Sequence, residues 1–133
     1  MITTIIFDFS YVLYLPQNEG KLNQDLIQFV TDNQTQFANY IFSASTPQTL
    51  DHFRPQLIPP FIDIFSSKEL GLSKYKAQTY QSLATKLGLS PQQILFTDDK
   101  LDNVAAAQKA DLQTIHFKNT AYFLKKAKKL LSI

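Results

Sequence analysis

Short apolar runs alternate with stretches of helical periodicity along the whole chain, and this alternation constrains the fold more than any other feature. Such a pattern is typical of a parallel sheet with helices on both faces. We therefore predict an α/β protein with a three-layer, doubly wound parallel sheet. The expected strands lie near residues 4–9, 39–43, 62–65, 93–97 and 113–117.

Helical segments between these strands are marked by apolar spacing and by capping residues. Thr46 before Pro47 is typical of an N-cap followed by the first helical position, and Pro55 with Pro59 and Pro60 predicts an early end of that helix. A later helix should end at Gly88. The expected buried faces carry Leu22, Leu26, Phe29 and Val30, then Tyr80, Leu83, Ala84 and Leu87, and finally Phe123, Ala127, Leu130 and Leu131.

Composition excludes several classes of protein. A chain of 133 residues fits one domain, residues 1–133, and its lack of cysteine excludes disulfides, thiolate metal sites and cysteine nucleophiles. A net charge of +2 does not indicate a nucleic-acid partner, and three glycines are too few for a glycine-rich nucleotide-binding loop. Without a membrane-spanning stretch or a signal-like N-terminus, we expect a cytoplasmic protein with no membrane partner.

Polar residues lie at the C-terminal ends of three of the expected strands. Asp8 follows the first, Ser43 ends the second, and Asp98 with Asp99 follows the fourth. Ligands of such sheets bind beyond the carboxyl ends of the strands. Carboxylates suit Mg²⁺, whereas hydroxyls and lysines suit phosphate. Each residue taken alone would serve equally well as a helix cap, and it is their order along the chain that favours a site.

That order resembles the haloacid dehalogenase-like (HAD) superfamily of phosphatases and phosphotransferases. The family's first motif is a strand ending in Asp-x-Asp-Gly-Thr-Leu, which IIFDFSYVL matches with Asp8 at the first aspartate. Its second motif is a strand ending in Ser or Thr, which YIFSAS matches at Ser43. The resemblance implies the HAD-like, Rossmannoid form of the predicted sheet.

The remaining two motifs are found in the C-terminal half of the chain. GLSKYKAQTY is similar to the third motif, with Lys74 as the lysine and Tyr80 as the aromatic residue six positions later, although the usual proline is missing. LFTDDKLDNVAAAQKADLQTIHF follows the fourth motif through Asp98, Asp99 and Asn103. This fourth motif is the most specific match.

The resemblance also implies a role for each matched residue. Asp8 would attack phosphorus and form an aspartyl phosphate. Its carboxylate, the backbone carbonyl of Ser10 and the carboxylate of Asp99 would hold Mg²⁺. Asp98 would assist the metal or its waters, and Asn103 would complete that group.

Two further residues would bind the phosphate. Ser43 would donate to a phosphate oxygen, and Lys74 would neutralise charge between the phosphate and Asp8. Lys76 is the alternative lysine, and for either lysine a solvated helix face is the competing interpretation.

Ser10 is the main departure from the family. It stands where family phosphatases have the aspartate that protonates the leaving oxygen, and Tyr11 and Val12 replace the motif's glycine and threonine. Loss of a positioned acid or base typically costs a factor of about 10² to 10⁴ in rate.

Asp8 and Ser43 are also so close in the sequence that only one helix and its loops fit between them. We therefore expect no separate cap domain.

Two classes of function remain open from the sequence. The first is a Mg²⁺-dependent hydrolase acting on a small phosphorylated substrate or a phosphorylated macromolecule. The second is a catalytically impaired HAD-fold pseudoenzyme that serves as a binding module. A metal-free dehalogenase is disfavoured because the acidic pair would lack a cation.

The sequence does not indicate the oligomeric state. His52 and His116 are interpreted as structural, and Phe61, Phe65, Tyr75 and Tyr80 as core residues.

Overall fold

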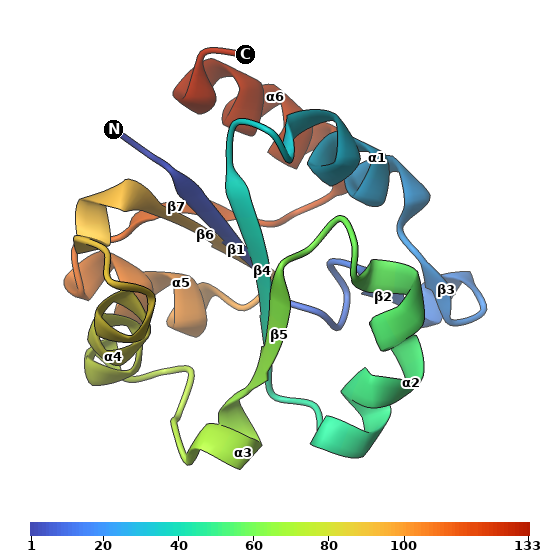
Figure 1. The fold of residues 1–133 in the computed structure, drawn as a ribbon, viewed down its shortest axis with the longest axis horizontal. Helices are drawn as coiled ribbons and strands as arrows, with labels where there is room; N and C mark the ends of the chain where they lie inside the picture. Colours follow the sequence, from blue (N-terminus) through green and yellow to red (C-terminus); the bar gives the residue numbers. More distant parts are fainter.

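All five predicted strands are present, and they form one parallel sheet. The computed structural model describes residues 1–133, and the strand order is β5-β4-β1-β6-β7 (Figure 1). Each expected strand is found within about two residues of its predicted bounds. The strands are β1 (Thr4–Phe7), β4 (Ala38–Ser43), β5 (Asp63–Ser66), β6 (Ile94–Asp98) and β7 (Gln113–His116).

Helices cover both faces of the sheet and complete the predicted three layers. One face carries α1 (Gln24–Asn33), α2 (Pro47–Leu57) and α6 (Thr120–Leu131). The other carries α4 (Ala77–Leu87) and α5 (Leu101–Lys109), as Figure 1 shows. The short helix α3 (Ser67–Leu70) follows β5, and two 3-10 turns cover Pro16–Asn18 and Pro91–Gln93.

The central strand β1 explains why the sheet is covered on both sides. Its side chains alternate between two hydrophobic clusters, with Ile5 and Phe7 in the α1–α6 cluster and Ile6 in the α4–α5 cluster. All three are fully buried. A strand that is apolar on both faces must be covered on both faces, which fixes β1 at the centre of the sheet.

The prediction that Pro55 shortens its helix is wrong. Thr46 does cap α2 through its side chain, and Pro47 occupies the first turn, but the helix continues through Pro55 to Leu57. Both Leu50 and Leu57 belong to the buried α1–α6 cluster. Their burial offsets the local cost of a proline inside a helix.

The C-terminal helix packs on the sheet through part of its expected apolar face. Phe123 and Ala127 are fully buried, whereas Leu130 is 44% exposed, contrary to prediction. Leu131, in the same turn, is partly buried and packs against the α1–α6 cluster, so Leu130 alone of the predicted face points to solvent. None of the helices combines the length and the apolar character needed to cross a membrane.

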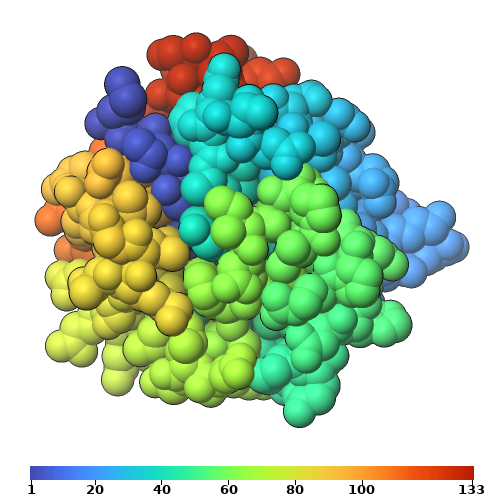
Figure 2. Space-filling model, viewed as in Figure 1, coloured from blue at the N-terminus to red at the C-terminus, as the bar shows by residue number.

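A small hairpin is the only insertion between β1 and α1. It pairs β2 (Tyr14–Leu15) with β3 (Lys21–Leu22) in antiparallel fashion. In the space-filling view its light-blue tip projects from the right edge of the molecule (Figure 2). No separate cap domain stands between Asp8 and Ser43, as the sequence predicted.

Phe123 should contribute strongly to stability because it packs against Phe7, Phe29 and Phe117 with ring centroids 5.7, 5.7 and 5.8 Å apart. We expect Phe123→Ala to lower the free energy of unfolding in urea by about 3–5 kcal/mol. The matched change at exposed Leu130, Leu130→Ala, should cost less than about 1 kcal/mol. Equal losses would show that α6 does not dock through Phe123.

Candidate active site

Polar residues from three strands meet at one edge of the sheet. The parallel register places Phe7 opposite Ile41 and Thr97. Asp8, the next residue along, is therefore level with Phe42 and Asp98, and its backbone N–H donates to the carbonyl of Thr97 at 3.0 Å. This register explains how residues 90 positions apart in the chain come together.

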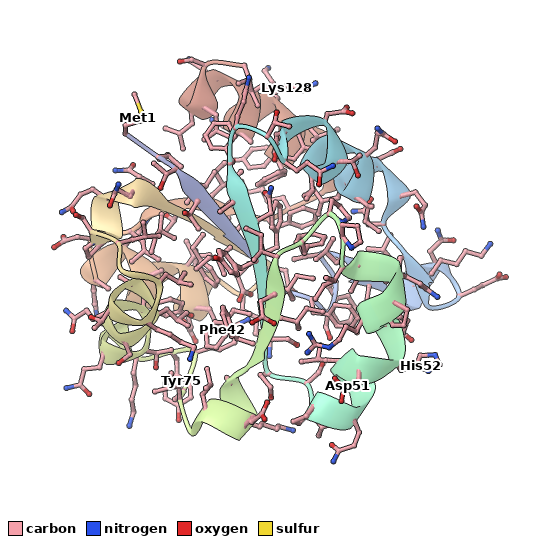
Figure 3. The ribbon with its side chains drawn as sticks, viewed as in Figure 1. Met1, Phe42, Asp51, His52, Tyr75 and Lys128 are labelled. Carbon is pink, nitrogen blue, oxygen red and sulfur yellow. The ribbon has the colours of Figure 1, made fainter.

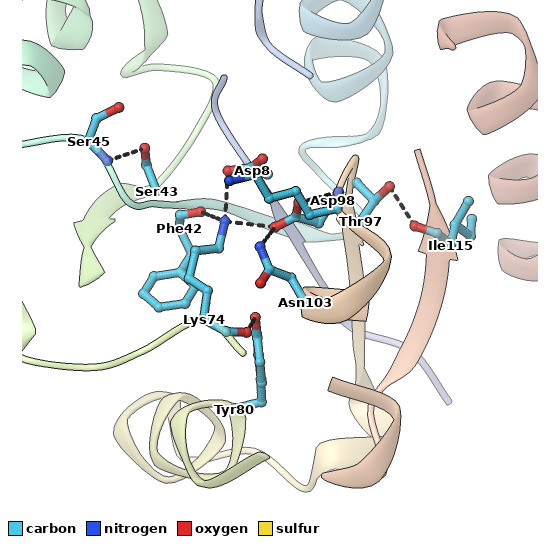
Figure 4. A network of polar contacts seen from close by, with 11 residues as sticks. Asp8, Phe42, Ser43, Ser45, Lys74, Tyr80, Thr97, Asp98, Asn103 and Ile115 are labelled. Carbon is cyan, nitrogen blue, oxygen red and sulfur yellow. Dashed lines mark hydrogen bonds and ion pairs between the residues drawn. The ribbon is translucent and has the colours of Figure 1, made fainter. Parts of the chain in front are cut away.

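Lys74 lies at the centre of this group. Its Nζ is 2.7 Å from Asp8 Oδ1 and 2.7 Å from Asp98 Oδ2, and it donates to the carbonyl of Phe42 at 3.1 Å (Figure 4). These three acceptors use all three donors of the ammonium group. The side chain is only 7% exposed, so this pairing is what makes burial of its charge possible.

The segment before α4 places Lys74. The buried hydroxyl of Tyr80 donates to the backbone carbonyl of Lys74, and the hydroxyl of Thr79 donates to the carbonyl of Ser73. Burial, followed by the charges of Asp98 and Asp8, raises the pKa of Tyr80 far above its usual range. Tyr80 therefore stays protonated and remains a donor.

The structure also separates the two candidate lysines. Lys74 reaches the carboxylates from the turn three residues before α4, rather than from the first turn of the helix. Lys76 is the N-cap residue of α4 and is exposed. Lys74 is thus the lysine that the fold brings to the sheet edge.

Asp98 is saturated by donors from the chain. Its Oδ1 accepts from the backbone N–H of Lys100 at 2.9 Å, and its Oδ2 accepts from Asn103 Nδ2 at 3.1 Å as well as pairing with Lys74. The side chain is fully buried. A carboxylate with both oxygens occupied in this way is suited to holding Lys74 and Asn103 in position.

Asp99 is placed differently from its neighbour. It is half-buried and lines the pocket above Asp8. Its backbone carbonyl lies 2.9 Å from His116 Nε2, a contact that holds the loop after β6 against β7. His116 therefore has the structural role that its isolation in the sequence suggested.

A divalent cation fits the oxygen atoms at this edge. Asp8, Asp98 and Asp99 each offer a carboxylate oxygen, and these oxygens lie within 4.8 Å of one another. The backbone carbonyl of Ser10 accepts no hydrogen bond from the chain. Three carboxylates against the single charge of Lys74 leave an excess of negative charge, and oxygen ligands of this kind are those that Mg²⁺ takes.

Burial makes Asp8 an unusually weak acid in the absence of a cation. The pKa of Asp8 is raised from 3.8 to about 7: desolvation is the largest cause, Lys74 opposes it, and the charge of Asp98 adds to it. A cation bound beside it would favour the ionised form instead. Asp8 is therefore prepared to become a carboxylate when a positive charge binds.

The turn after Asp8 carries Ser10 and Tyr11. The backbone of Tyr11 is left-handed, with φ of 65°, at the position where the first HAD motif has glycine. The turn persists because the N–H of Tyr11 donates to the carbonyl of Tyr14 at 2.7 Å. Tyr11 is 52% exposed and lines the rim of the pocket without filling it.

Ser43 also lines this pocket, which has a volume of about 310 Å³. Its Oγ accepts from the backbone N–H of Ser45 at 3.0 Å, so the hydroxyl proton is free to be donated to a ligand. The pocket thus combines a carboxylate, a hydroxyl donor and the ammonium group of Lys74.

Comparison with solved structures finds proteins of similar fold. YfnB from Bacillus subtilis, solved bound to magnesium, is 15% identical with a TM-score of 0.84 over 99% of both chains. A predicted HAD-like family hydrolase from Porphyromonas gingivalis is 17% identical with a TM-score of 0.81, covering 100% of this chain and 99% of its own.

A third similar structure was solved with its ligands bound. The HAD family enzyme BT-2542 from Bacteroides thetaiotaomicron, in complex with magnesium and inorganic phosphate, is 12% identical with a TM-score of 0.75, covering 87% of this chain and 94% of its own. No protein-family model matches the chain, and no curated protein matches its sequence. At these identities the similarity is one of fold, and the chain has the HAD-like hydrolase fold.

Several groups at the site carry no signal in the sequence. The carbonyl of Phe42 and the N–H of Lys100 act through the backbone, which residue type does not reveal. The side chains of Lys68 and Lys100 also line the pocket. Lys100 directly follows the acidic pair, and this adjacency is the one signal that could have indicated it.

Replacing Asp8 should change how stability depends on pH. Folded Asp8 holds its proton more tightly than unfolded Asp8, so the wild type should lose stability as pH rises from 3.8 to about 7. An Asp8→Asn variant lacks this titration. In buffer with a chelator, we measure the free energy of unfolding of Asp8→Asn minus that of wild type. We expect this difference to increase by more than about 1 kcal/mol from pH 5 to pH 8.

The measurement is urea unfolding of both proteins at the two pH values. Other titrating groups are common to the two proteins and cancel in the difference. A difference independent of pH would mean that Asp8 titrates near its ordinary value and is not desolvated as the structure indicates.

Proposed function

We propose that this protein is a Mg²⁺-dependent phosphatase or phosphotransferase that acts through an aspartyl phosphate on Asp8. The observation that carries the proposal is the 2.7 Å ion pair between Lys74 Nζ and Asp8 Oδ1 at the base of a pocket that also holds Ser43. A carboxylate next to an ammonium group and a free hydroxyl donor suits attack on a phosphate.

The proposed metal ligands are Asp8, Asp99 and the carbonyl of Ser10. A bound Mg²⁺ would supply charge neutralisation for the phosphoryl group. Asp98 and Asn103, which the sequence suggested for the same metal, are assigned here to positioning. Both oxygens of Asp98 are occupied by chain donors, and the amide of Asn103 is directed at Asp98.

Phosphoryl transfer divides the remaining work among residues of the chain. A carboxylate oxygen of Asp8 bonds to phosphorus while the bond from phosphorus to the leaving oxygen breaks, leaving both electrons on that oxygen. Ser43 donates to a phosphoryl oxygen, and Lys74 exchanges its contact with Asp8 Oδ1 for one with the phosphoryl group as Asp8 bonds to phosphorus. Attack of water, or of an acceptor hydroxyl, on phosphorus then releases Asp8 as a carboxylate.

Ser10 determines which substrates this site can process. A serine hydroxyl does not act as an acid near neutral pH, so the leaving oxygen must take its proton from solvent. Leaving groups that need no proton, such as nitrophenolate, should be released faster than alkoxides. Water must also attack the aspartyl phosphate without a positioned base, which should lengthen the lifetime of this intermediate.

We therefore expect Mg²⁺-dependent hydrolysis of nitrophenyl phosphate in preference to an alkyl phosphate, with a phosphoryl adduct on Asp8. Restoring a carboxylate with Ser10→Asp should increase alkyl phosphate hydrolysis by up to about 10²-fold, because it supplies the missing acid. Steady-state kinetics and intact-mass measurement test these expectations.

The controls are variants that remove one group each. Asp8→Asn should abolish activity and adduct, and Asp99→Asn should abolish the response to Mg²⁺. Asp32→Asn makes the same change at an exposed residue of α1 and should have no effect. If folded wild type shows neither activity nor adduct and Ser10→Asp restores nothing, the binding-module function replaces this one.

A further inference from the structure

A second cavity continues outward from the proposed phosphate pocket. It has a volume of about 660 Å³ and lies between the loop joining α3 to α4 and the start of α5. The two cavities share lining residues, among them Ala44, Lys74 and Asn103. Any group attached to a phosphate bound near Asp8 can therefore extend into this groove, whose size suits a small molecule.

Four of the 11 residues that line the groove are hydrophobic, and two of these four are unusually exposed. Tyr75, in the loop before α4, is 69% exposed, and Leu101, the first residue of α5, is 63% exposed. Figure 3 labels Tyr75 on the segment between α3 and α4. The interpretation of Tyr75 as a core residue is thus wrong, because its side chain points to solvent while Lys74 next to it points inward. A flat or apolar group placed between Tyr75 and Leu101 would cover both.

Charge in the groove is mostly positive and unpaired. Lys68 and Lys100 line both cavities, and neither forms an ion pair with a carboxylate. Lys74, by contrast, is neutralised by Asp8 and Asp98. Asp102 is the one acidic residue of the groove.

The first turn of α5 adds to this positive character. Its N-cap residue, Lys100, provides no side-chain acceptor, and the backbone N–H groups of Leu101 and Asp102 make no hydrogen bond within the chain. Unpaired N–H groups at the start of a helix favour negative charge. They reinforce the two lysines rather than forming a site of their own.

We propose that this groove binds the leaving group of the substrate, and that this leaving group is a small molecule with a flat or apolar part and a second anionic group. The apolar part would lie between Tyr75 and Leu101, and the anionic group would bind Lys68 and Lys100. This inference rests on the proposed function, since it assumes that a phosphoryl group occupies the pocket at Asp8.

Binding of two non-hydrolysable probes tests the inference without turnover. The probes are 4-carboxybenzylphosphonate and its neutral analogue 4-carbamoylbenzylphosphonate, titrated into the Mg²⁺-loaded protein by calorimetry. We expect the carboxylate to bind about fivefold more tightly, because it gains exposed ion pairs with the two lysines. This preference should shrink at high salt, where exposed charges are screened.

Variants assign the preference to the groove. Lys68→Gln and Lys100→Gln should each reduce the ratio of the two dissociation constants, and together they should bring it to about one. Lys109→Gln removes the same charge from the far end of α5 and should preserve the ratio. Tyr75→Ala should weaken both probes about equally, since both carry the ring.

The outcomes separate the two claims. If both phosphonates bind but with equal affinity, or if the preference survives the double lysine substitution, the groove proposal is wrong while the phosphate site stands. If neither phosphonate nor inorganic phosphate binds in the presence of Mg²⁺, the proposed function itself fails. A preference lost equally in Lys109→Gln would reflect net charge alone and would also overturn the groove.

Discussion

The burial of Lys74 between Asp8 and Asp98 is the interaction on which the rest of the site depends. One ammonium group joins the ends of β1, β4 and β6 to the segment that precedes α4. Removing one partner from a buried ion pair leaves a charge without compensation, which is far more costly than the pair itself is stabilising. The two carboxylates thus require the lysine as much as the lysine requires them.

The same network divides the two adjacent aspartates into different roles. Asp98 is fully buried and saturated, whereas Asp99 is half-buried and faces the pocket. This difference follows from the alternation of side chains at the end of a strand, where one residue points into the protein and the next one points out. Two adjacent residues of the same type therefore differ in their surroundings: Asp98 holds Lys74, and Asp99 faces the pocket.

Much of the fold, and which polar residues meet at the ends of the strands, could be predicted from the sequence, because hydrophobic periodicity and strand ends are local signals. What could not be predicted depends on packing. Pro55 lies inside α2 because Leu50 and Leu57 are buried on either side of it, and no residue near Pro55 reveals this. Lys74 and Tyr75 are adjacent yet point in opposite directions, which only the path of the loop decides. One oxygen of Asp98 accepts from the backbone N–H of Lys100, and no sequence motif indicates a contact made by a backbone group.

The most direct test of this account is a crystal structure with Mg²⁺ and beryllofluoride, a mimic of the aspartyl phosphate. We predict octahedral density for a cation bound by Asp8, Asp99 and the carbonyl of Ser10, with beryllofluoride on Asp8 within hydrogen-bond distance of Lys74 and Ser43. Asp98 should keep its contacts with Lys74 and Asn103. A protein in which Asp8 remains unmodified and no cation lies beside it, at saturating concentrations of both ligands, would contradict the account.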